Sequence, residues 1–584
     1  MKADRRARSL LLLAPAALLL AGFFFYPLLQ IVRLSFEGAD GWQANYRAFF
    51  HSAVYGVVML RTFGVGLSVT IACLVLGYPT AAFLSHAPRR WQKVLLLLVI
   101  VPYLTSLLVR TYAWVVLLND EGPINRLLVA SGLAADPLPL LYSRWGMLIG
   151  MVHILLPMMV LPIYASMLRA DVMQVRAAHS LGAGPLRTFF RIYLPQTMPG
   201  VRSGCVLVFI IALGFYITPM ALGGLSDIML SNLIAEQITT AVNFPMAAVM
   251  ALVLLFATLV FYTLTGMLLQ RSGRRVASGS ITAPATLRGR MQEAAGRFHA
   301  RRWHRNLERS GSRMQWLSHA RTSIGIIILL YLAIPSLVVI AVSFNASEIL
   351  SFPPSGWSLR WYRSFIEGTE WKEATVLSLR IALLSTIVAL TFGTMAAFAI
   401  DRWQGAAAKR LMNALMMAPM IVPPVIVAIG VFTVLAAWGM IGTVSAIVLE
   451  HACIGLTYVV IVVGGTLSSF DVALERAAAS LGAGSARTFF RVTLPLIAPG
   501  VMAAGLFAFI HSFDEVVLTS FIAGNQNRTL PLKMWEDIRN QVDPTIAAVS
   551  SLLILLPVLA LPLVGRRFAG MSGRRAAASA GAKV

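Results

Sequence analysis

The stretch DVMQVRAAHSLGAGPLRTFFRIYLPQTMPG occupies residues 171–200, and DVALERAAASLGAGSARTFFRVTLPLIAPG occupies residues 471–500. The two stretches align without a gap at an offset of 300 and are identical at 19 of 30 positions. Agreement of this extent indicates that the chain consists of two homologous halves. Upstream the offset is 316, because Gly77 of GYPTAAF aligns with Gly393 of GTMAAFA. The first half therefore carries about 16 extra residues, which we expect in the polar stretch NDEGPINRLLVASGLAADPLPLLYS.

The composition excludes most soluble classes. Of the 584 residues, 58% are hydrophobic and 12% are charged, whereas soluble domains carry about 25% charged residues. A soluble enzyme, a disordered chain and, with three cysteines, a disulfide scaffold are therefore excluded. Apolar runs of about 20 residues, the length of a transmembrane helix, occur six times in each half. We predict an all-α membrane protein with about twelve transmembrane helices, near 9–33, 62–85, 93–118, 145–168, 202–222 and 246–270, and near 322–344, 378–400, 411–437, 443–468, 500–522 and 545–565.

The basic residues indicate the orientation of these helices. The net charge is +24, and 34 of the 48 Lys and Arg residues lie in alternate loops, at both ends and in a linker. By the positive-inside rule, both termini and the linker face the cytoplasm, so a nucleic-acid partner is not expected. We predict a first half over 1–270, a basic linker over 271–320 and a second half over 321–584. The linker is interpreted as a tether, and contact with anionic headgroups is compatible with that role. The N-terminal run is interpreted as an uncleaved first span rather than a signal peptide.

The two copies of the repeated stretch share one expected structure. An Ala-rich segment before Leu181 and Leu481 favours a helix, and the following glycine pairs permit a turn. The amphipathic Arg-Thr-Phe-Phe-Arg segment comes next, and the Leu-Pro pair is expected to stop it before the chain re-enters the membrane. The result is an exposed helix–turn–helix surface. It either docks a soluble partner, which the duplication favours, or lies on the lipid headgroups.

The repeated stretch resembles the cytoplasmic signature of the integral membrane subunits of binding-protein-dependent ABC importers. That signature is Glu-Ala-Ala, three residues, Gly, nine residues and Ile-x-Leu-Pro. Both copies fit its spacing, but Arg replaces the family's Glu, Val replaces Ile in the second copy, and Glu475 lies one position early. The candidate coupling residues are Arg176, Ala177, Ala178, Gly182, Gly184, Phe189, Phe190, Leu194 and Pro195, and Arg476, Ala477, Ala478, Gly482, Gly484, Phe489, Phe490, Leu494 and Pro495.

Further stretches narrow the resemblance. The first half is similar to B-type permeases of spermidine/putrescine importers, through YPLLQIVRLSF, LGYPTAAFL, VPYLTSLLVRTYAW and HILLPMMVLPIY. The second half is similar to the C-type partner, through GTMAAFAI, FAFIHSFDEVVLTSFIAG and LPLKMWEDIR. Importers of opines, aminophosphonates or ferric ions are the alternatives within the class. An ion-coupled secondary transporter with two repeats is disfavoured, because such a transporter needs no duplicated cytoplasmic docking loop.

The resemblance implies an ATP-driven importer in the bacterial inner (plasma) membrane. Two copies of an ABC ATPase subunit would dock on the two loops, and a periplasmic solute-binding protein would deliver a small charged solute. The chain contains no G-x-x-x-x-G-K-[ST] motif, so ATP and Mg are expected in the partner ATPase and no cofactor in this chain. The chain is therefore expected to be a transporter subunit rather than an enzyme, and no metal-ligand spacing occurs in it.

Ionisable residues within spans are functional candidates, because burying them in a bilayer is costly. Asp514 and Glu515 align with Gly214 and Phe215, so the acidic pair exists in one half only. We consider two interpretations: the pair lines the pathway and attracts a cationic solute, or it is hydrated near the outer mouth or paired with Arg110 or Arg380. The remaining pathway candidates are Arg110, Tyr112, Trp114 and Tyr216, although aromatic residues in spans usually serve packing.

Overall fold

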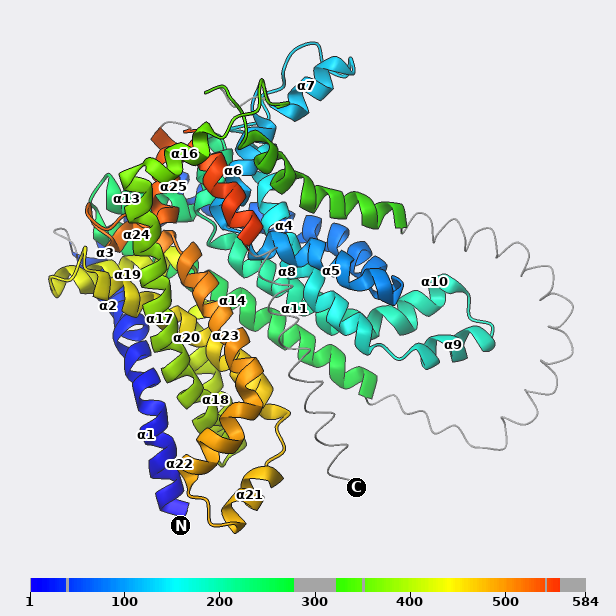
Figure 1. Ribbon diagram of the computed structural model, residues 1–584, viewed down its shortest axis with the longest axis vertical. Coiled ribbons are helices and arrows are strands. Elements are labelled where there is room, and N and C mark those ends of the chain that lie inside the picture. Colours follow the sequence, from blue (N-terminus) through cyan, green and yellow to red (C-terminus); the bar gives the residue numbers. More distant parts are fainter. Residues whose placement is uncertain (1, 38–40, 278–321, 349–351, 541–542, 557–584) are drawn as a thin grey trace, which may run out of the picture.

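The computed structural model describes residues 2–37, 41–277, 322–348, 352–540 and 543–556 (Figure 1). Within these ranges the chain is helical, apart from loops and an isolated bridge between Asn345 and Trp357. Most of the predicted linker and the end of the last predicted span lie outside the described residues. The predicted fold class, an all-α membrane protein, is confirmed.

The first half begins with a span made of three consecutive helical segments and continues through fourteen further elements. In chain order they are α1 (Lys2–Leu20), η1 (Ala21–Phe25), α2 (Tyr26–Ser35), α3 (Trp42–His51), α4 (Ala53–His86), α5 (Arg89–Leu104), α6 (Leu107–Leu118), α7 (Pro123–Ala130), α8 (Arg144–Arg169), α9 (Val172–Ser180), α10 (Pro185–Thr188), η2 (Phe189–Tyr193), α11 (Leu194–Leu213), α12 (Ile217–Leu222), η3 (Leu225–Asp227), α13 (Leu230–Thr239) and α14 (Phe244–Ala277).

The second half repeats this order with a shorter loop after its third span. It begins with the helix Thr322–Val342 and continues with α16 (Arg360–Glu367), α17 (Thr369–Arg402), α18 (Ala406–Met417), η4 (Ala418–Met420), α19 (Pro424–Ala437), α20 (Val444–Ser468), α21 (Ala473–Ser480), α22 (Ser485–Thr488), η5 (Phe489–Thr493), α23 (Leu494–Asp514), α24 (Val517–Ile522) and α25 (Leu530–Asn540). An apolar helix follows at Thr545–Leu556. The extra residues of the first half lie between α6 and α8, as expected.

In the described residues, nine helices are long and apolar enough to cross a membrane, and two bent pairs raise the number to eleven. The bent pairs are the third spans of the two halves, with breaks of 96° in the first and 90° in the second. Proline explains the second break, because it removes an N–H donor and disfavours helix in the preceding residue. Pro423 directly precedes α19, and Pro424 is the first residue of that helix. In the first half Pro102 lies inside α5, and the break follows at Thr105 and Ser106.

The fifth spans differ from their predicted bounds. The predicted span 202–222 is helical from Pro185 to Leu213 and then breaks, so the expectation that Leu194-Pro195 stops a helix is wrong. The reason is the π-helical turn η2, in which the Leu194 N–H bonds to the Phe189 carbonyl. In this wider turn each N–H bonds to the carbonyl five residues back rather than four. The hydrogen-bond pattern therefore shifts by one residue just before Pro195, which has no N–H, and the helix continues. The second half contains the same turn as η5.

The two halves exchange their first spans. Helix α1 packs on α17 and α2 packs on α19 of the second half (Figure 1). Reciprocally, the helix Thr322–Val342 packs on the first half, where Tyr331 Oη donates to the Ile149 carbonyl at 2.7 Å. Because each half contributes a span to the other's core, the halves cannot separate without exposing both cores.

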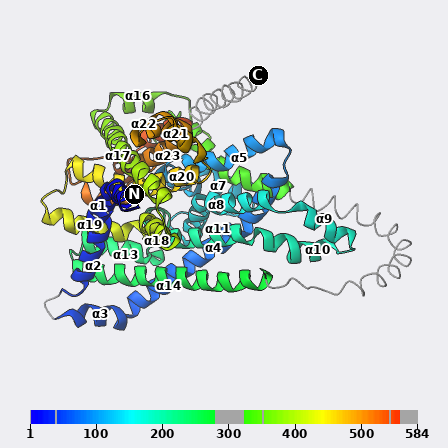
Figure 2. The ribbon, with the colours of Figure 1, turned by 90° about the horizontal axis from the view of Figure 1, so that it is seen from below.

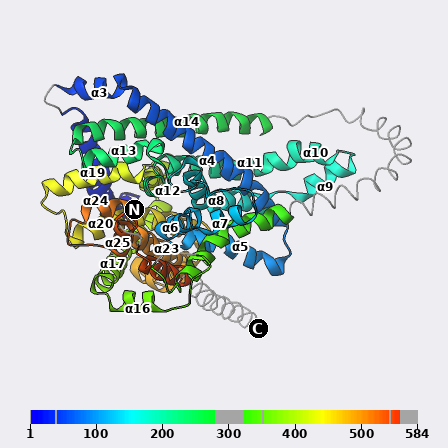
Figure 3. The same ribbon diagram turned by 90° about the horizontal axis from the view of Figure 1, so that it is seen from above.

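The arrangement has an approximate twofold character. Seen from below and from above, α3 of the first half and α16 of the second lie at opposite edges of the molecule (Figures 2 and 3). The halves meet where α13, α24 and α25 lie and diverge toward α9–α10 and α21–α22 (Figure 1). The repeated stretches therefore lie at the far ends of the two halves.

Candidate functional site

The repeated stretch folds identically in both halves. Asp171 begins the first copy by accepting the Met173 N–H at 2.9 Å, and Asp471 accepts the Ala473 N–H at 2.9 Å. A side-chain acceptor of this kind satisfies one of the free donors at a helix start. The short helices α9 and α21 then end at Ser180 and Ser480, two residues before Gly182 and Gly482, whose φ angles are +81° and +82°. A residue with a side chain is strained at this φ angle, so the backbone conformation explains why the signature has a glycine here.

The second glycine of each pair does not share that reason. Gly184 and Gly484 have φ angles of −66° and −67° and extended backbone, which any residue adopts. An ideal Cβ at either position would meet no atom within 4 Å. The expectation that both glycines of the pair are needed for the turn is therefore wrong for Gly184 and Gly484 within this chain. Their surface is open, and a side chain there would be met only by a partner.

One phenylalanine of each pair faces the chain and the other faces away. Phe189 packs edge-on against Tyr78 of α4, and Phe489 packs edge-on against Phe398 of α17. Phe190 and Phe490, by contrast, are 60% and 65% exposed. Leu181 and Leu481 are also exposed. Large apolar groups of this kind, rimmed by polar residues, mark interaction sites.

The predicted coupling residues form one surface in each half. Exposed members are Arg176, Ala177, Gly182, Gly184, Phe190, Pro195, Arg476, Ala477, Gly482, Gly484, Phe490 and Pro495; half-buried members are Phe189, Leu194, Ala478, Phe489 and Leu494; Ala178 is buried. We call these two sets the first and second coupling surfaces. The motif arginines point out, while Glu475 is bonded to Arg402 and Thr493 within the chain. The exposed charge at the motif position is therefore positive in both copies.

The helix breaks of the two halves meet one another. Asp514, the last residue of α23, accepts the Leu107 N–H at 3.0 and 3.2 Å and so caps α6 across the interface between halves. At the equivalent contact, Gly214 of the first half takes the place of Asp514, and Pro423 of the second half takes the place of Leu107. A Cβ added to Gly214 would lie 2.7 Å from the Pro423 Cβ. Since Pro423 has no N–H, that site offers no donor and has no room for a carboxylate. This explains why the acid occurs in one half only.

The neighbouring acid is also bonded. Glu515 is buried and accepts the Leu518 N–H at 2.6 Å, which caps α24. Among the described residues neither acid forms an ion pair with Arg110 or Arg380. Arg110 is buried and donates to the Ile154 carbonyl at 3.1 Å. The structure thus gives Asp514 and Glu515 capping roles, and their place in a pathway stays a prediction.

Replacing Asp514 by Ala is expected to lower the free energy of unfolding by about 1 kcal/mol, because the start of α6 loses its capping acceptor. Asp514→Asn keeps one acceptor oxygen and should lower it less. Thermal unfolding in detergent measures both changes, and Ser106→Ala, which removes the other α6 cap, is the matched control. If Asp514→Ala left stability unchanged but reduced solute uptake, the pathway role would be supported over capping.

Tyr112 and Trp114 are core residues. Both are buried, and Trp114 packs edge-on against His153 at 5.5 Å between ring centroids. Neither faces the cavity described next, and neither do Arg110, Asp514 and Glu515. Of the predicted pathway residues, Tyr216 is the one that lies there.

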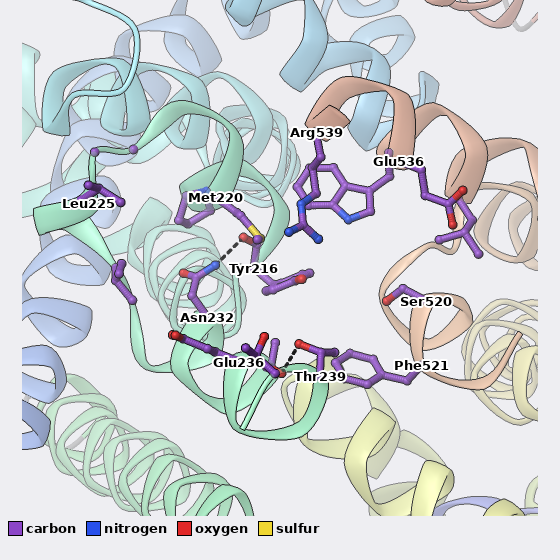
Figure 4. A pocket seen from close by; sticks show the side chains of 18 residues that line it. Tyr216, Met220, Leu225, Asn232, Glu236, Thr239, Ser520, Phe521, Glu536 and Arg539 are labelled. Atoms are coloured by element: carbon purple, nitrogen blue, oxygen red, sulfur yellow. Dashed lines mark hydrogen bonds between the residues drawn. The ribbon is translucent and has the colours of Figure 1, made fainter. Parts of the chain in front are cut away.

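A cavity of about 520 Å³ lies between the halves, directly beyond the helix breaks (Figure 4). It is lined by α12 and α13 of the first half and by α24 and α25 of the second. Tyr216 and Arg539 point into it from opposite halves, and the Tyr216 ring lies 6.1 Å from the Trp535 ring. Glu236 lines the same cavity and is exposed. Glu536 lines it too, but its carboxylate is paired with Arg528 at 3.4 Å. The cavity therefore offers aromatic faces, two carboxylates and a guanidinium to one small molecule.

Sequence reasoning missed most of this lining. Glu236, Trp535 and Arg539 lie outside the predicted spans, so the search for charges within spans did not reach them. The offset of 300 contained the signal, since it aligns Glu236 with Glu536 on α13 and α25. Glu536 differs from its counterpart, because it pairs with Arg528 at 3.4 Å.

Two homologous helical halves, an interface cavity and a repeated exposed loop define a class of protein, the membrane permeases. The chain belongs to the family described as binding-protein-dependent transport system inner membrane component, whose domain matches residues 74–277 and 389–577. The family resemblance predicted from the repeated stretch is thus confirmed, with two permease domains in one chain.

Individual relatives share substantial sequence with this chain. It is 35% identical to the spermidine/putrescine transport system permease protein PotB of Escherichia coli (strain K12) over 240 residues, 40% of this chain and 87% of that protein. It is 33% identical to PotB of Haemophilus influenzae over 250 residues, 41% of this chain and 87% of the relative. It is 31% identical to the putrescine transport system permease protein PotI of E. coli (strain K12) over 230 residues, 38% of this chain and 82% of the relative.

Proposed function

We propose that this chain is the fused membrane subunit of an ATP-driven importer that takes up polyamines or a related small charged solute. The duplicated coupling surface is the observation that carries the proposal. An ATP-driven importer needs a dock for each of two ATPase subunits, and the chain offers the same exposed surface twice. ATP and Mg would be bound by those partners. The protein would lie in the bacterial inner membrane with its termini and linker in the cytoplasm.

The chemistry of the coupling surfaces predicts the chemistry of the dock. Each surface combines an exposed phenylalanine and leucine with arginines such as Arg176 and Arg187, or Arg476 and Arg487. Charged groups on an interface are matched by opposite charges on the partner. We therefore expect the ATPase groove to contain an apolar pocket with carboxylates at its rim, which reverses the charge expected from the family signature.

The opposite end of the molecule supports a second partner, a periplasmic solute-binding protein. The loop around α7 is organised by buried Asn125, which donates to the Leu138 carbonyl at 2.9 Å and accepts the Leu138 N–H at 2.9 Å. Yet Leu127 and Leu133 on this ordered loop are 70% and 79% exposed. An ordered loop that presents large apolar side chains is typical of a docking surface.

The cavity supports a small amine-bearing solute. Ammonium groups bind aromatic faces and carboxylates, and Tyr216, Trp535 and Glu236 supply both kinds of group. The named relatives transport spermidine and putrescine, according to their descriptions. A polyamine is therefore the first candidate.

One observation favours a second candidate. Arg539 points into the cavity (Figure 4) and repels a polycation, whereas it would bind a carboxylate or phosphonate well. A zwitterionic solute, such as an opine or aminophosphonate, would use Arg539 and Glu236 together. The positive charge of Arg539 therefore opposes binding of a polyamine and favours binding of a zwitterion.

Reconstitution tests the proposal. The full chain is placed in proteoliposomes with an ABC ATPase subunit and a periplasmic solute-binding protein from the same organism, and uptake of labelled putrescine and spermidine is measured with and without ATP. Uptake that requires ATP, both partners and the chain is expected. Uptake that persists without ATP and follows an imposed ion gradient would establish the secondary-transporter alternative instead. Competition with an opine and an aminophosphonate then ranks the solutes.

A further inference from the structure

The two coupling surfaces are attached to their halves differently. The Glu475 Oε1 atom accepts two hydrogen bonds, one from Arg402 Nη2 at 2.7 Å and one from the Thr493 hydroxyl at 2.7 Å. The Glu475 and Arg402 side chains are 18% and 23% exposed. One carboxylate therefore joins α21, the end of α17 and the π-helical turn η5.

Further contacts extend this attachment along α17. The Arg402 guanidinium lies 5.2 Å from the centre of the Phe398 ring, which packs on Phe489 of the coupling surface. Asp401 pairs with Arg402 at 3.5 Å and with Lys409 at 3.2 Å. The second coupling surface is thus held to the membrane helices by a continuous group of charged and aromatic side chains.

Among the residues that the structure describes, the first half has no equivalent of the Glu475–Arg402 pair. At the aligned positions Val175 replaces Glu475 and His86 replaces Arg402. His86 bonds to the Ala82 carbonyl of its own helix at 2.8 Å. The first coupling helix is instead held by neutral hydrogen bonds, in which the Gln196 amide accepts the Asp171 N–H at 2.7 Å and donates to Gln174 at 3.1 Å.

We infer that Glu475 is a positioning residue that fastens the second coupling helix to α17, and that the first coupling helix lacks this fastening. Hydrogen bonds between ionised groups are about twice as strong as neutral ones, and partial burial limits their screening by salt. Helix α21 therefore moves with α17 as one body, while α9 moves more freely relative to α4. For coupling to an ATPase the inference rests on the proposed function, whereas the fastening itself does not.

Hydrogen exchange of the full chain in nanodiscs tests the fastening without any partner. Glu475→Gln is expected to speed amide exchange in residues 473–480 about tenfold, the effect of losing one charged hydrogen bond of about 1.5 kcal/mol, and to leave residues 172–180 unchanged. The charge exchange Glu475→Arg with Arg402→Glu re-forms the ion pair but not the Thr493 hydrogen bond, so it should restore part of the protection. Unchanged exchange in Glu475→Gln would overturn the inference.

The first half supplies a matched gain-of-contact variant. Val175→Glu with His86→Arg places the same pair at the aligned positions and should slow exchange in residues 172–180, while Val175→Gln with His86→Gln should not. Solute transported per ATP hydrolysed is the functional readout, expected to fall about threefold in Glu475→Gln and to recover in part in the charge exchange. If exchange changes as expected but the chain never couples to an ATPase, the proposed function fails and the fastening stands.

Discussion

Replacing Gly184 and Gly484 together by Trp is expected to abolish ATP-dependent uptake while the protein still folds in the membrane. Both glycines have ordinary φ angles, and nothing in the chain lies within 4 Å of an added Cβ. The substitution therefore adds no strain at the backbone or at Cβ, and we expect the indole, which extends from an exposed position, to clash with a docked partner. Overpacking an interface costs about 1–3 kcal/mol per site, so two sites weaken docking by at least roughly thirtyfold.

Co-purification of the ATPase subunit with tagged chain measures this loss, and uptake into proteoliposomes confirms it. Gly56→Trp is the matched control, because it also meets no atom within 4 Å and lies on α4, at the start of the helix. Gly182→Trp is a poorer probe, since a φ of +81° strains any side chain and mixes folding with docking. If the double variant retained the ATPase and full uptake, the coupling surfaces would not be the dock.

The single variants carry additional information. If the two coupling surfaces were equivalent, Gly184→Trp and Gly484→Trp would reduce uptake equally. The fastening of α21 through Glu475 predicts that they differ, because a rigidly held surface cannot shift to accommodate the added indole. We expect the variant at Gly484 to be the more damaging of the two.

The repeat and most of the spans could be predicted from the sequence because both depend on local composition. A run of about 20 apolar residues is a sufficient signal for a membrane helix, and an alignment at a fixed offset needs no structure. Ordinary helix signals located the turn at Gly182 as well. They failed at Pro195, because the π-helical turn before it is recognisable only from the backbone pairing.

The role of Asp514 could not be predicted, because its partner is a backbone N–H in the other half. An aspartate at 514 and a glycine at the aligned position 214 suggest a functional difference between the halves, since a charged residue in a membrane span is a candidate for a functional site. The difference is explained once Leu107 and Pro423 are seen to occupy equivalent positions. The cavity was missed for a related reason: α13 and α25 lie outside the predicted spans, and they form a site only where the halves meet.

The last prediction concerns the solute and uses the twofold relation of Glu236 and Glu536. Glu236→Gln removes an exposed carboxylate from the cavity lining and is expected to raise the KM for an amine-bearing solute roughly tenfold, the loss of one charged hydrogen bond of about 1.5 kcal/mol. Glu536→Gln is the matched control, because that carboxylate is already paired with Arg528 and should matter less. Uptake at varied solute concentration measures both.

Arg539→Gln then separates the two candidate solutes by the sign of its effect. For a polyamine the guanidinium is a repelling charge in the cavity, so its removal should lower the KM. For a zwitterion it is the partner of the anionic group, so its removal should raise the KM roughly tenfold. Because Arg539 is exposed at the end of α25, the substitution should leave the fold intact, which the unfolding temperature verifies. Unchanged KM values in both Glu236→Gln and Arg539→Gln would place solute recognition outside this cavity.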